Sequence, residues 1–459
     1  MSAPVTHRTA AEIGRTPLGP RPLPELGATR EVPLPEVVTE TLPTGLRVLA
    51  VHRPGVPLVE LRLRVPFAGP SPLADAAYAA QAELLSSTLL TGTASRDRVA
   101  IDDALAAVGA DLGVAVDPER LLVQGSGLAE GLPAVLEVLA EVLTGASYPE
   151  AELARERARL VERISVARAQ PQTVAREALQ RKRFGAHPIG LEMPTGEAVE
   201  AVSAEQVRAL HGAGVVPRGS TLVLVGDIDP QAALAGVGKA LGDWASAGTA
   251  RELSPPPLPG PGPLELVHRP GSVQSQLRLT GPALQRDAEG YTAFQLANLV
   301  FGGYFSSRWM ENIREDKGYT YGAHSGAEFV PGGAVLGVET DVASDVTAAA
   351  LLETRYELGR MVAVPPTAEE ISSARRYAIG SLLISLDSQG GLASTLAALD
   401  AAGLGVDWLR ERPVRLEETT PEQVAEAALE YFAPERFTGV VVGDAEVVGA
   451  RLRALGGVA

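Results

Sequence analysis

The side chains that most often bind metals or act as nucleophiles are sparse in this sequence. It contains no Cys, which excludes disulfides, thiolate metal sites, iron–sulfur clusters and cysteine nucleophiles. A helical zinc site commonly uses two imidazoles one turn apart. None of the six histidines has a partner four residues away, so no such pair exists in this chain. They stand at His7, His52, His187, His211, His268 and His324.

Basic residues gather between positions 155 and 183, as they do on nucleic-acid-binding surfaces. Glutamates are interleaved among them, and this spacing favours ion pairs along a helix face. No stacking aromatic residues accompany them, and aromatic residues make up only 4% of the chain. We therefore predict an ion-paired helix face and no nucleic-acid partner. The residues are Arg155, Arg157, Arg159, Arg163, Arg168, Arg176, Arg181, Lys182 and Arg183, with Glu152, Glu156, Glu162 and Glu177.

The composition is that of a large, well-packed protein. With 459 residues the chain exceeds one ordinary hydrophobic core, so we expect two or more domains. Forty basic against 56 acidic side chains give a net charge of −16, which argues against nucleic acid and anionic membranes as partners. The first twenty residues lack the apolar core of a secretory signal, and no run of eighteen apolar residues occurs. We therefore expect a cytoplasmic protein without a membrane-spanning segment.

The sequence repeats itself at a nearly constant offset. Three short segments recur in the same order, 216 or 217 residues later. One coincidence of this kind means little, but three in order indicate a tandem duplication into two homologous halves. The pairs are His52-Arg53-Pro54-Gly55 with His268-Arg269-Pro270-Gly271, Ala204-Glu205-Gln206-Val207 with Pro421-Glu422-Gln423-Val424, and Leu224-Val225-Gly226-Asp227 with Val441-Val442-Gly443-Asp444.

Proline-rich stretches mark the predicted boundaries. The segment 254–263 contains six prolines, which lack amide donors, so it cannot join a helix or an inner strand. The predicted organisation is a flexible Pro/Arg-rich arm at 1–35, a first half at 36–250, a Pro-rich linker at 251–264 and a second half at 265–459.

Within the first half, periodicity predicts strands, then helices, then strands. Apolar and polar residues alternate on both sides of the Pro54-Gly55 turn, which predicts a half-buried hairpin of 46–51 and 58–65. Helical spacing follows, and the half closes with a strand ending at Gly226-Asp227. The fold class is therefore α+β, with a largely antiparallel sheet layered with helices, used twice. Further helices are predicted at 75–90, 99–108, 132–143 and 150–169, and strands at 121–125 and 221–225.

At this point the sequence resembles a known family over nearly its whole length. That family is the pitrilysin/insulinase and mitochondrial-processing-peptidase family of zinc peptidases, the inverzincins. The order and spacing of the motifs, added to the duplication, carry the resemblance. The motifs are Thr41-Leu42-Pro43-Thr44-Gly45-Leu46-Arg47-Val48, Thr91-Gly92-Thr93, His187-Pro188-Ile189-Gly190, Gly226-Asp227, Phe301-Gly302-Gly303-Tyr304-Phe305-Ser306-Ser307-Arg308, Ile313-Arg314-Glu315 and Gly318-Tyr319-Thr320-Tyr321.

The resemblance locates a zinc motif that this chain has lost. Active members carry His-x-x-Glu-His on a helix, where the two imidazoles bind Zn²⁺ and the Glu activates water. Counted back from Gly92-Thr93, that motif falls on 83–87, where Glu83, Ser86 and Ser87 replace both ligands and the general base. The third ligand would fall near Glu162, and a lone carboxylate does not hold zinc. We therefore expect no catalytic metal in this chain.

The second half contains an Arg and a Tyr that match another part of the family's active site. In the family, an Arg and a Tyr seven residues later reach from the non-zinc half to the zinc site. The resemblance gives these roles to Arg314 and Tyr321 and makes Gly302, Gly303 and Tyr319 substrate-binding residues. A guanidinium and a phenol both donate hydrogen bonds suited to an oxyanion.

The local pattern around these residues predicts a helix followed by a strand. A helix is expected at 305–313, with Arg314 in its last turn and Gly318 as its left-handed stop. A strand is expected from Tyr319 onward, which would place Tyr319 and Tyr321 on one face. Which of the two rings acts is therefore open.

Some members of the family divide the two functions between two chains. Our main hypothesis is that this chain is a zinc-free subunit that completes the active site of a homologous zinc-binding partner. The two subunits together would cleave peptides. Such a chain would be inactive alone. The alternative is a non-catalytic scaffold or a peptide-binding pseudopeptidase in which Arg314 and Tyr321 are idle.

Each singled-out residue also has a purely structural interpretation. Arg314 would then pair with a neighbouring carboxylate such as Glu315. Tyr319 would pack against the sheet, and Gly302 and Gly303 would be turn residues. The two His-Arg-Pro-Gly segments, which occur in both halves, would be turn chemistry.

Overall fold

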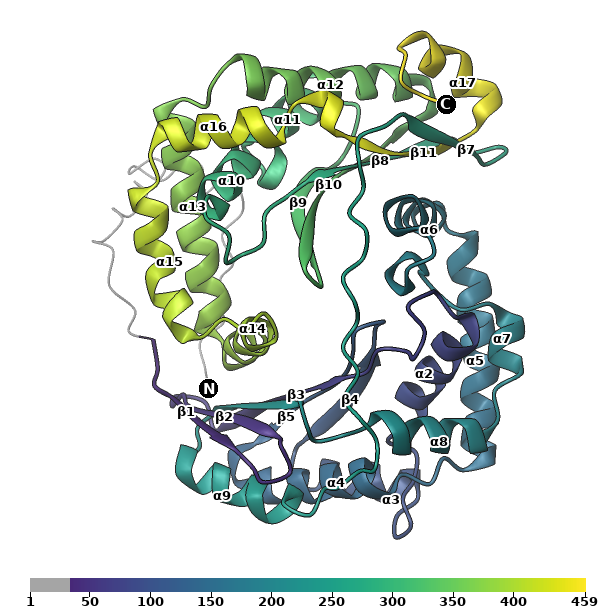
Figure 1. Cartoon of the computed structure of the whole chain (residues 1–459), viewed down its shortest axis with the longest axis vertical. Coiled ribbons are helices and arrows are strands. Elements are labelled where there is room, and N and C mark those ends of the chain that lie inside the picture. Colours follow the sequence, from purple (N-terminus) through teal and green to yellow (C-terminus); the bar gives the residue numbers. More distant parts are fainter. Residues whose placement is uncertain (1–33) are drawn as a thin grey trace, which may run out of the picture. The chain divides into compact units, whose positions relative to one another are not determined.

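The computed structural model describes residues 34–459, so all but the last two positions of the predicted arm lie outside the described residues. Residues 35–459 form one compact unit that contains both halves of the sequence repeat. Figure 1 shows each half as a sheet covered by helices. The predicted α+β class is thus confirmed. The boundaries predicted between the two halves stay a prediction, although no strand or helix occurs between 252 and 263.

The first half contains a six-stranded sheet with helices between and after its strands. Its elements are β1 (Val37–Thr41), β2 (Arg47–His52), β3 (Leu58–Pro66), α2 (Ala76–Thr88), α3 (Arg98–Ala106), β4 (Asp111–Val116), β5 (Arg120–Leu128), α4 (Leu132–Gly145), α5 (Glu150–Ala169), α6 (Pro171–Phe184), α7 (Gly196–Glu200), α8 (Ala204–Gly214), β6 (Thr221–Gly226) and α9 (Pro230–Leu241). The helices predicted from periodicity all form, within a few residues of their expected ends.

The second half contains a five-stranded sheet. Its elements are β7 (Leu264–His268), β8 (Gln274–Pro282), α10 (Tyr291–Asn298), a π-helix (Leu299–Gly303), α11 (Arg308–Met310), a second π-helix (Glu311–Asp316), β9 (Ala323–Val330), β10 (Gly333–Ala343), α12 (Thr347–Ala363), α13 (Ala368–Asp387), α14 (Gln389–Ala401), α15 (Val406–Glu418), α16 (Pro421–Tyr431), β11 (Thr438–Gly443) and α17 (Ala445–Ala454).

The strand order confirms the duplication. The first sheet has the order β1-β2-β6-β3-β5-β4, and the second has β7-β11-β8-β10-β9. Without β1, the two orders correspond strand for strand. Only β2 with β6, and β7 with β11, pair in parallel; every other neighbouring pair is antiparallel. Each sheet is therefore largely antiparallel, as the sequence predicted.

The predicted hairpins are wrong, because the closing strand of each half lies between their two strands. The segments 46–51 and 58–65 are strands, but β6 separates β2 from β3, and β11 separates β7 from β8. Every residue of β6 and β11 is buried, which suits a central position covered on both faces. The alternation of apolar and polar residues within a short segment cannot show that the neighbouring strand comes from about 170 residues later in the chain.

The repeated Gly-Asp segment marks the end of this inserted strand. The amide of Arg53 donates to the carbonyl of Gly226 at 2.7 Å, and the amide of Arg269 donates to that of Gly443 at 2.8 Å. A Cβ on Gly226 would lie 2.3 Å from the carbonyl oxygen of Leu58. Glycine is therefore required here by the close approach of two backbones.

The repeated Glu-Gln-Val segment marks a helix start in both halves. Ser203 begins α8 and Thr420 begins α16, each with a side chain that accepts from the amide three residues later. The side chains of Gln206 and Gln423 in turn accept from the backbone amides of Ser203 and Thr420. This second hydrogen bond completes a capping box in each half. The repeat thus preserves the hydrogen bonds that begin a helix.

The two halves exchange equivalent helices. Helix α6 of the first half packs on β8 and β11, and helix α14 of the second half packs on β3 and β6. Beneath α6 the contact is apolar and is formed by Ala175, Ala178 and Leu179 with Val440 and Val442. In Figure 1, α14 lies on the opposite side of the first sheet from α4 and α9.

Polar contacts reinforce this exchange. Arg183, whose side chain is 1% exposed, donates twice to Glu328, at 2.8 and 3.0 Å. On the other side, Asp400 accepts from Arg47 at 2.9 Å and from Thr221 at 2.7 Å. Breaking a buried pair of this kind leaves an unpaired charge, so these contacts hold the halves in one register.

The arginines of the two His-Arg-Pro-Gly segments make equivalent contacts across the halves. Arg53 donates to the carbonyl of Asp387, the last residue of α13, and Arg269 donates to that of Ala169, the last residue of α5. A cation at a helix C-terminus satisfies a free carbonyl and complements the helix dipole. The repeated arginine therefore joins each half to the long helix of the other, beyond the turn role predicted from sequence.

Within residues 34–459 no single helix combines the length and apolarity needed to cross a membrane. Helices α13 and α14 meet that test only when taken together, across a bend of 109°.

We predict that Gly226→Ala destabilises the first half, because the new methyl group meets the backbone of β3. Overpacking of this kind costs about 1–3 kcal/mol. Urea unfolding followed by circular dichroism should show a lower midpoint. Gly212→Ala is the matched control, because nothing lies within 4 Å of its added Cβ on α8, and it should keep or raise the midpoint. Equal midpoints for the two variants would contradict the close approach at Gly226.

Candidate functional site

The residues predicted to replace the zinc motif lie on α2. This helix begins at Asp75, whose carboxylate accepts from the amides of Ala77 and Tyr78. Glu83, Ser86 and Ser87 follow on the same helix. Ser86 is almost buried, and the Ser87 hydroxyl donates to the carbonyl of Leu84 at 3.2 Å, so neither is positioned as a ligand.

The first half does not offer the donor set that zinc requires. Glu83 lies 3.8 Å from Arg163, and Glu162 is exposed on α5. Burial raises the pKa of Glu83 above its usual value, and the positive charge of Arg163 partly opposes that shift. Across residues 34–459 no group of three or more His, Asp or Glu is arranged to hold a metal ion. Two hydroxyls and one carboxylate do not make a zinc site.

The segment that carries the predicted Arg and Tyr folds differently from the sequence prediction. The helix expected at 305–313 begins only at Arg308, after Tyr304 and Ser307 adopt extended backbone conformations. The turns before and after are π-helical, at Leu299–Gly303 and Glu311–Asp316. Runs of π-helix are rare and occur often at functional sites. Arg314 lies in the second of them, in the last turn as predicted.

Gly302 and Gly303 are required by packing. A Cβ on Gly302 would lie 2.9 Å from the ring of Trp309, and one on Gly303 would lie 2.9 Å from the amide nitrogen of Asn298. Trp309 in turn stacks on Phe301 at 5.5 Å between ring centroids and donates to Thr354 at 3.1 Å. The glycines thus allow a buried aromatic stack, and their contact with substrate stays a prediction.

Arg314 is half-buried and has two neighbours. Its Nε lies 3.3 Å from a carboxylate oxygen of Glu315, and its guanidinium lies 4.7 Å from the ring centroid of Phe305. The ion pair predicted by the structural interpretation is therefore present. Glu315 is 53% exposed, so this pair contributes little and exchanges readily with water or ligand. The Phe305 ring, which is 56% exposed, fixes the plane of the guanidinium.

The two tyrosines are separated by their environments. Strand β9 begins only at Ala323, so the prediction that both rings share one strand face is wrong. Gly318 does provide the left-handed stop, with a φ of +64°. Tyr319 packs against the core of the second half, whereas Tyr321 is 98% exposed. The exposed ring is free to contact a ligand.

A polar network that sequence reasoning missed holds the turn of Arg314 in place. Asn312 donates to Glu353 at 3.0 Å and to Glu357 at 2.8 Å, both on α12. The Glu357 side chain is 1% exposed and also binds Arg360 at 3.3 Å. A buried carboxylate of this kind requires its partners. Nothing in the local sequence joins Asn312 to residues about forty positions later.

A second buried contact holds the beginning of α11, the short helix that precedes this turn. Arg308 donates to both oxygens of Glu370, at 2.6 and 2.8 Å, and its side chain is 4% exposed. Burial by itself would raise the pKa of Glu370, but hydrogen bonds from Arg308 and from the amide of Thr367 outweigh it and lower the pKa to about 2. The capping-box spacing of Thr367 and Glu370 was the signal available in the sequence.

The basic run at 155–183 forms ion pairs, three of them with the interleaved glutamates of the prediction (Glu152, Glu156 and Glu177) and four with other carboxylates. The pairs are Arg155 with Glu152, Arg157 with Glu150, Arg159 with Glu156, Arg163 with Glu83, Arg168 with Glu177, Arg176 with Glu192 and Arg183 with Glu328. These positive charges are largely neutralised by neighbours. The expectation of no nucleic-acid partner stays a prediction.

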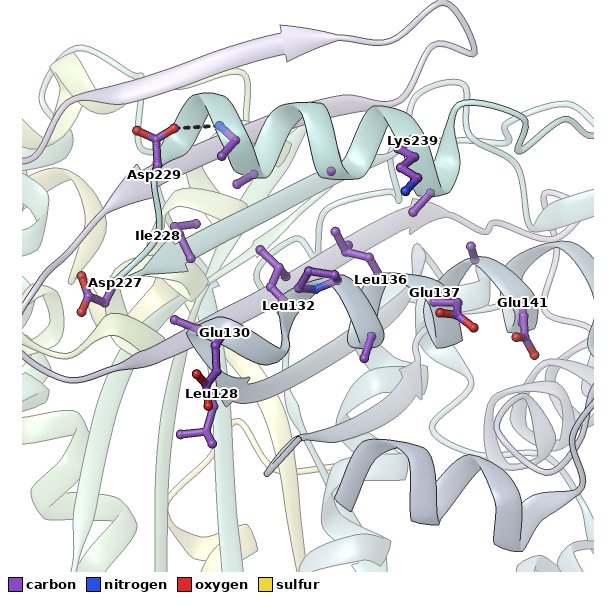
Figure 2. A pocket seen from close by; sticks show the side chains of 18 of the residues that line it. Leu128, Glu130, Leu132, Leu136, Glu137, Glu141, Asp227, Ile228, Asp229 and Lys239 are labelled. Atoms are coloured by element: carbon purple, nitrogen blue, oxygen red, sulfur yellow. Dashed lines mark hydrogen bonds between the residues drawn. The ribbon is translucent and has the colours of Figure 1, made fainter. Parts of the chain in front are cut away.

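A groove of about 1470 Å³ runs between α4 and α9, away from every residue predicted to act. Figure 2 shows Glu137 and Glu141 on α4, with Asp229 and Lys239 on α9. Three of its carboxylates are already engaged, because Glu137 and Glu141 bind Arg96 and Asp229 caps α9. We therefore assign no chemistry to this groove.

Comparison with protein families gives two matches. Residues 75–195 match the family described as "Insulinase (Peptidase family M16)", and residues 201–377 match that described as "Peptidase M16 inactive domain". Together the matches cover about two thirds of the chain.

Curated relatives and solved structures agree with these matches. An uncharacterized zinc protease of Streptomyces coelicolor is 24% identical over 93% of this chain and 93% of its own length. One of Mycobacterium tuberculosis is 24% identical over 88% of this chain and 92% of its own. The crystal structure of a peptidase M16 inactive domain from Pseudomonas fluorescens has a TM-score of 0.80 at 23% identity, covering 89% of this chain and 98% of that one. A protease from Helicobacter pylori has a TM-score of 0.80 at 16% identity, covering 89% and 100%.

The Arg308–Glu370 pair predicts a specific loss of stability in acid. Because the pKa of Glu370 is lowered in the folded state, its contribution is complete above the ordinary Glu pKa and is lost as pH falls from about 4.5 to about 2. Glu370→Gln should therefore lower the thermal unfolding midpoint at pH 7 and flatten its decline below pH 4.5. Glu369→Gln, on the same turn of α13, is the control and should leave the acid profile as in wild type. A Glu370→Gln profile parallel to that of wild type would show that the pair is not formed.

Proposed function

Because this chain belongs to the M16, or insulinase, family of peptidases, we propose that it is a zinc-free subunit that completes the active site of a homologous zinc-binding partner. The pair would cleave peptides, with Arg314 and Tyr321 supplied by this chain. The metal and its bound water belong to the partner in this proposal, since Glu83, Ser86 and Ser87 do not fit zinc. This chain by itself is expected to be inactive.

The observation that carries the proposal is the exposure of Tyr321 next to a hydrogen-bonded residue. The Tyr321 ring is 98% exposed, so packing in this chain does not account for it. The preceding residue is held to the neighbouring strand, because the Thr320 hydroxyl donates to the carbonyl of Asp341 at 2.8 Å. An exposed aromatic ring beside a held backbone is typical of a contact with another molecule.

The chemistry of the two side chains suits peptide hydrolysis. The guanidinium of Arg314 is a planar fork of donors, and the phenol of Tyr321 is a single directed donor. Donors of this kind, placed around a carbonyl that becomes an oxyanion, stabilise the transition state more than the substrate. The weak pair with Glu315 leaves most guanidinium donors free for such a contact.

The edges of the two sheets support binding of an extended peptide. Strands β4 and β9 are edge strands, each with only one neighbour in the described sheets. Unpaired backbone groups on an edge pair readily with an added strand. Because Tyr321 stands two residues before β9, a peptide added to that edge would pass beside the ring.

We predict that the double variant Arg314→Ala, Tyr321→Phe lowers peptide cleavage by the reconstituted pair. The loss of one such donor typically costs about 10²–10³ in rate. The effect should fall mainly on kcat, because the donors act on the developing charge. The measurement is steady-state hydrolysis of a quenched fluorescent peptide by this chain mixed with a zinc-bearing M16 protein from the same genome.

Matched variants separate this role from a general defect. Arg410→Ala removes an arginine that is similarly paired with a nearby carboxylate, Asp407, and should leave the rate unchanged. Tyr319→Phe should also leave it unchanged if Tyr321 is the acting ring. Full activity of the double variant in a cleaving pair would leave only the scaffold or peptide-binding alternative.

A further inference from the structure

The groove of about 1470 Å³ between α4 and α9 contains no residue predicted to act, but its walls are suited to binding. It lies on the opposite side of the first sheet from α14, the helix that the second half contributes. Small residues such as Ala140, Gly236 and Ala240 line it, and Leu136 beside them is 1% exposed. Small side chains at a helix surface let another element approach closely.

The second half contains the equivalent pair of helices. An offset of 215 residues relates the short turn Ala129–Gly131 before α4 to Ser344–Val346 before α12. The same offset relates Asp229, which caps α9, to Asp444, which caps α17. Helices α12 and α17 therefore correspond to α4 and α9. The buried positions agree at this offset, and they are Ala233, Leu234 and Val237 in α9 and Val448, Gly449 and Leu452 in α17.

Two arginines bridge this pair of helices in the second half. Arg355 of α12 donates to the carbonyls of Gly456 and Gly457, just beyond α17, at 2.8 and 3.3 Å. Arg451 of α17 donates to the carbonyl of Asp345, just before α12, at 3.2 Å. Each arginine thus joins one helix to the segment beside the other.

The first half has small residues where these arginines stand. At the offset of 215, Ala140 corresponds to Arg355 and Gly236 corresponds to Arg451. Both Ala140 and Gly236 line the groove. The groove is therefore open at the two positions from which the second half extends a guanidinium group.

Acidic side chains outnumber basic ones around the groove. Six carboxylates line it, with Lys239 as the one basic residue among its described walls. Glu130, Asp227 and Asp243 are exposed and form no ion pair with other residues of 34–459. Figure 2 shows Glu130 and Asp227 near one end of the groove and Lys239 toward the other. Basic side chains on an occupant would complement these charges.

A buried donor at the groove also lacks a partner. Trp244 lines the groove just beyond the end of α9 and is 1% exposed. Its Nε1 has no acceptor among the described residues. A buried donor without an acceptor is costly, so an occupant that brings a carbonyl to it gains affinity.

The walls of the groove favour a helical occupant. The backbone groups of α4 and α9 bond within each helix, so these walls offer no edge to an extended strand. A helix satisfies its own backbone, and the carbonyls of its last turn remain free to accept from a donor such as Trp244. Helix α9 has 12 residues, a length of about 18 Å, which matches about three turns of an added helix.

We propose that this groove binds a basic amphipathic helix of a partner protein. The apolar face of that helix would lie on Ala140 and Gly236, and its arginines or lysines would pair with Glu130, Asp227 and Asp243. A second copy of this chain fits less well, because its net charge of −16 opposes an acidic groove. The inference requires neither a zinc-bearing subunit nor peptide cleavage.

Binding of model peptides by the isolated chain tests the inference. The probes are two fluorescein-labelled peptides of about eighteen residues, long enough to be helical in water. Both carry the same face of alanine and leucine, and the flanking positions hold arginine in one and glutamine in the other. Fluorescence anisotropy at low salt should give a Kd about ten-fold lower for the arginine peptide, and this difference should shrink at high salt. Equal affinities at low salt would overturn the inference.

Arginine substitutions in this chain locate the binding. Ala140→Arg and Gly236→Arg introduce the side chains that the second half carries, and each should weaken binding of the arginine peptide about ten-fold. Ala235→Arg adds the same charge to an exposed position of α9 outside the groove and should preserve the affinity. Circular dichroism checks that all three variants fold. Equal weakening by all three would show a general effect of charge and would refute the groove.

Carboxylate substitutions separate the groove from the charge of the whole chain. The triple variant Glu130→Gln, Asp227→Asn, Asp243→Asn should abolish the preference for arginine. The control triple variant, which has the same net charge, removes exposed carboxylates outside the groove and should keep that preference. Its changes are Glu162→Gln, Glu200→Gln and Glu205→Gln. A preference that survives the first triple variant would contradict the proposed pairing.

Sedimentation velocity of the chain without peptide distinguishes a second copy as the occupant. Self-association that Ala140→Arg abolishes would identify that copy and would refute the basic helix. The outcomes remain separable from those for Arg314 and Tyr321, because an inactive pair with intact binding of the arginine peptide would remove only the subunit role.

Discussion

The insertion of each closing strand between two strands that are consecutive in the chain governs this structure. β6 enters between β2 and β3, and β11 enters between β7 and β8, each by a parallel pairing on one side and an antiparallel pairing on the other. Gly226 permits the backbone approach that this requires. The insertion ties the end of each half to its beginning, because the amides of Arg53 and Arg269 donate to the last residues of the closing strands. The side chains of these arginines then reach the long helix of the other half.

The duplicated halves share this framework but differ where chemistry is expected. In the first half, α2 is a regular helix that carries Glu83, Ser86 and Ser87, the residues predicted to stand at the metal positions. In the second half, the repeat offset places α10 and the π-helix Leu299–Gly303 at the position of α2, and α11 and the second π-helix follow. That irregular segment depends on a stack of Phe301 on Trp309. Duplication thus conserves the sheets and the exchanged helices, whose packing both halves need, while the segments at the ends of the strands diverge.

The proposed role of Tyr321 depends on where the ring lies in the second half. It stands two residues before β9, an edge strand whose outer backbone groups are unpaired within the described sheets. The hydroxyl of the preceding residue, Thr320, donates to the carbonyl of Asp341 at 2.8 Å. A backbone held in this way next to the ring reduces the ordering that is needed when a ligand binds.

The sequence alone determined the duplication, the α+β class, the helix positions of the first half and the absence of a helical zinc motif, because each of these depends on residues close together or on a fixed repeat. It also predicted roles for Arg314 and Tyr321, through the spacing of a known family. Only the tertiary structure decided that β6 and β11 divide the expected hairpins, that Tyr319 is packed while Tyr321 is exposed, and that Asn312 is held by Glu357. These outcomes depend on partners that lie far along the chain, and local periodicity contains no information about which distant group will arrive beside a given backbone or side chain.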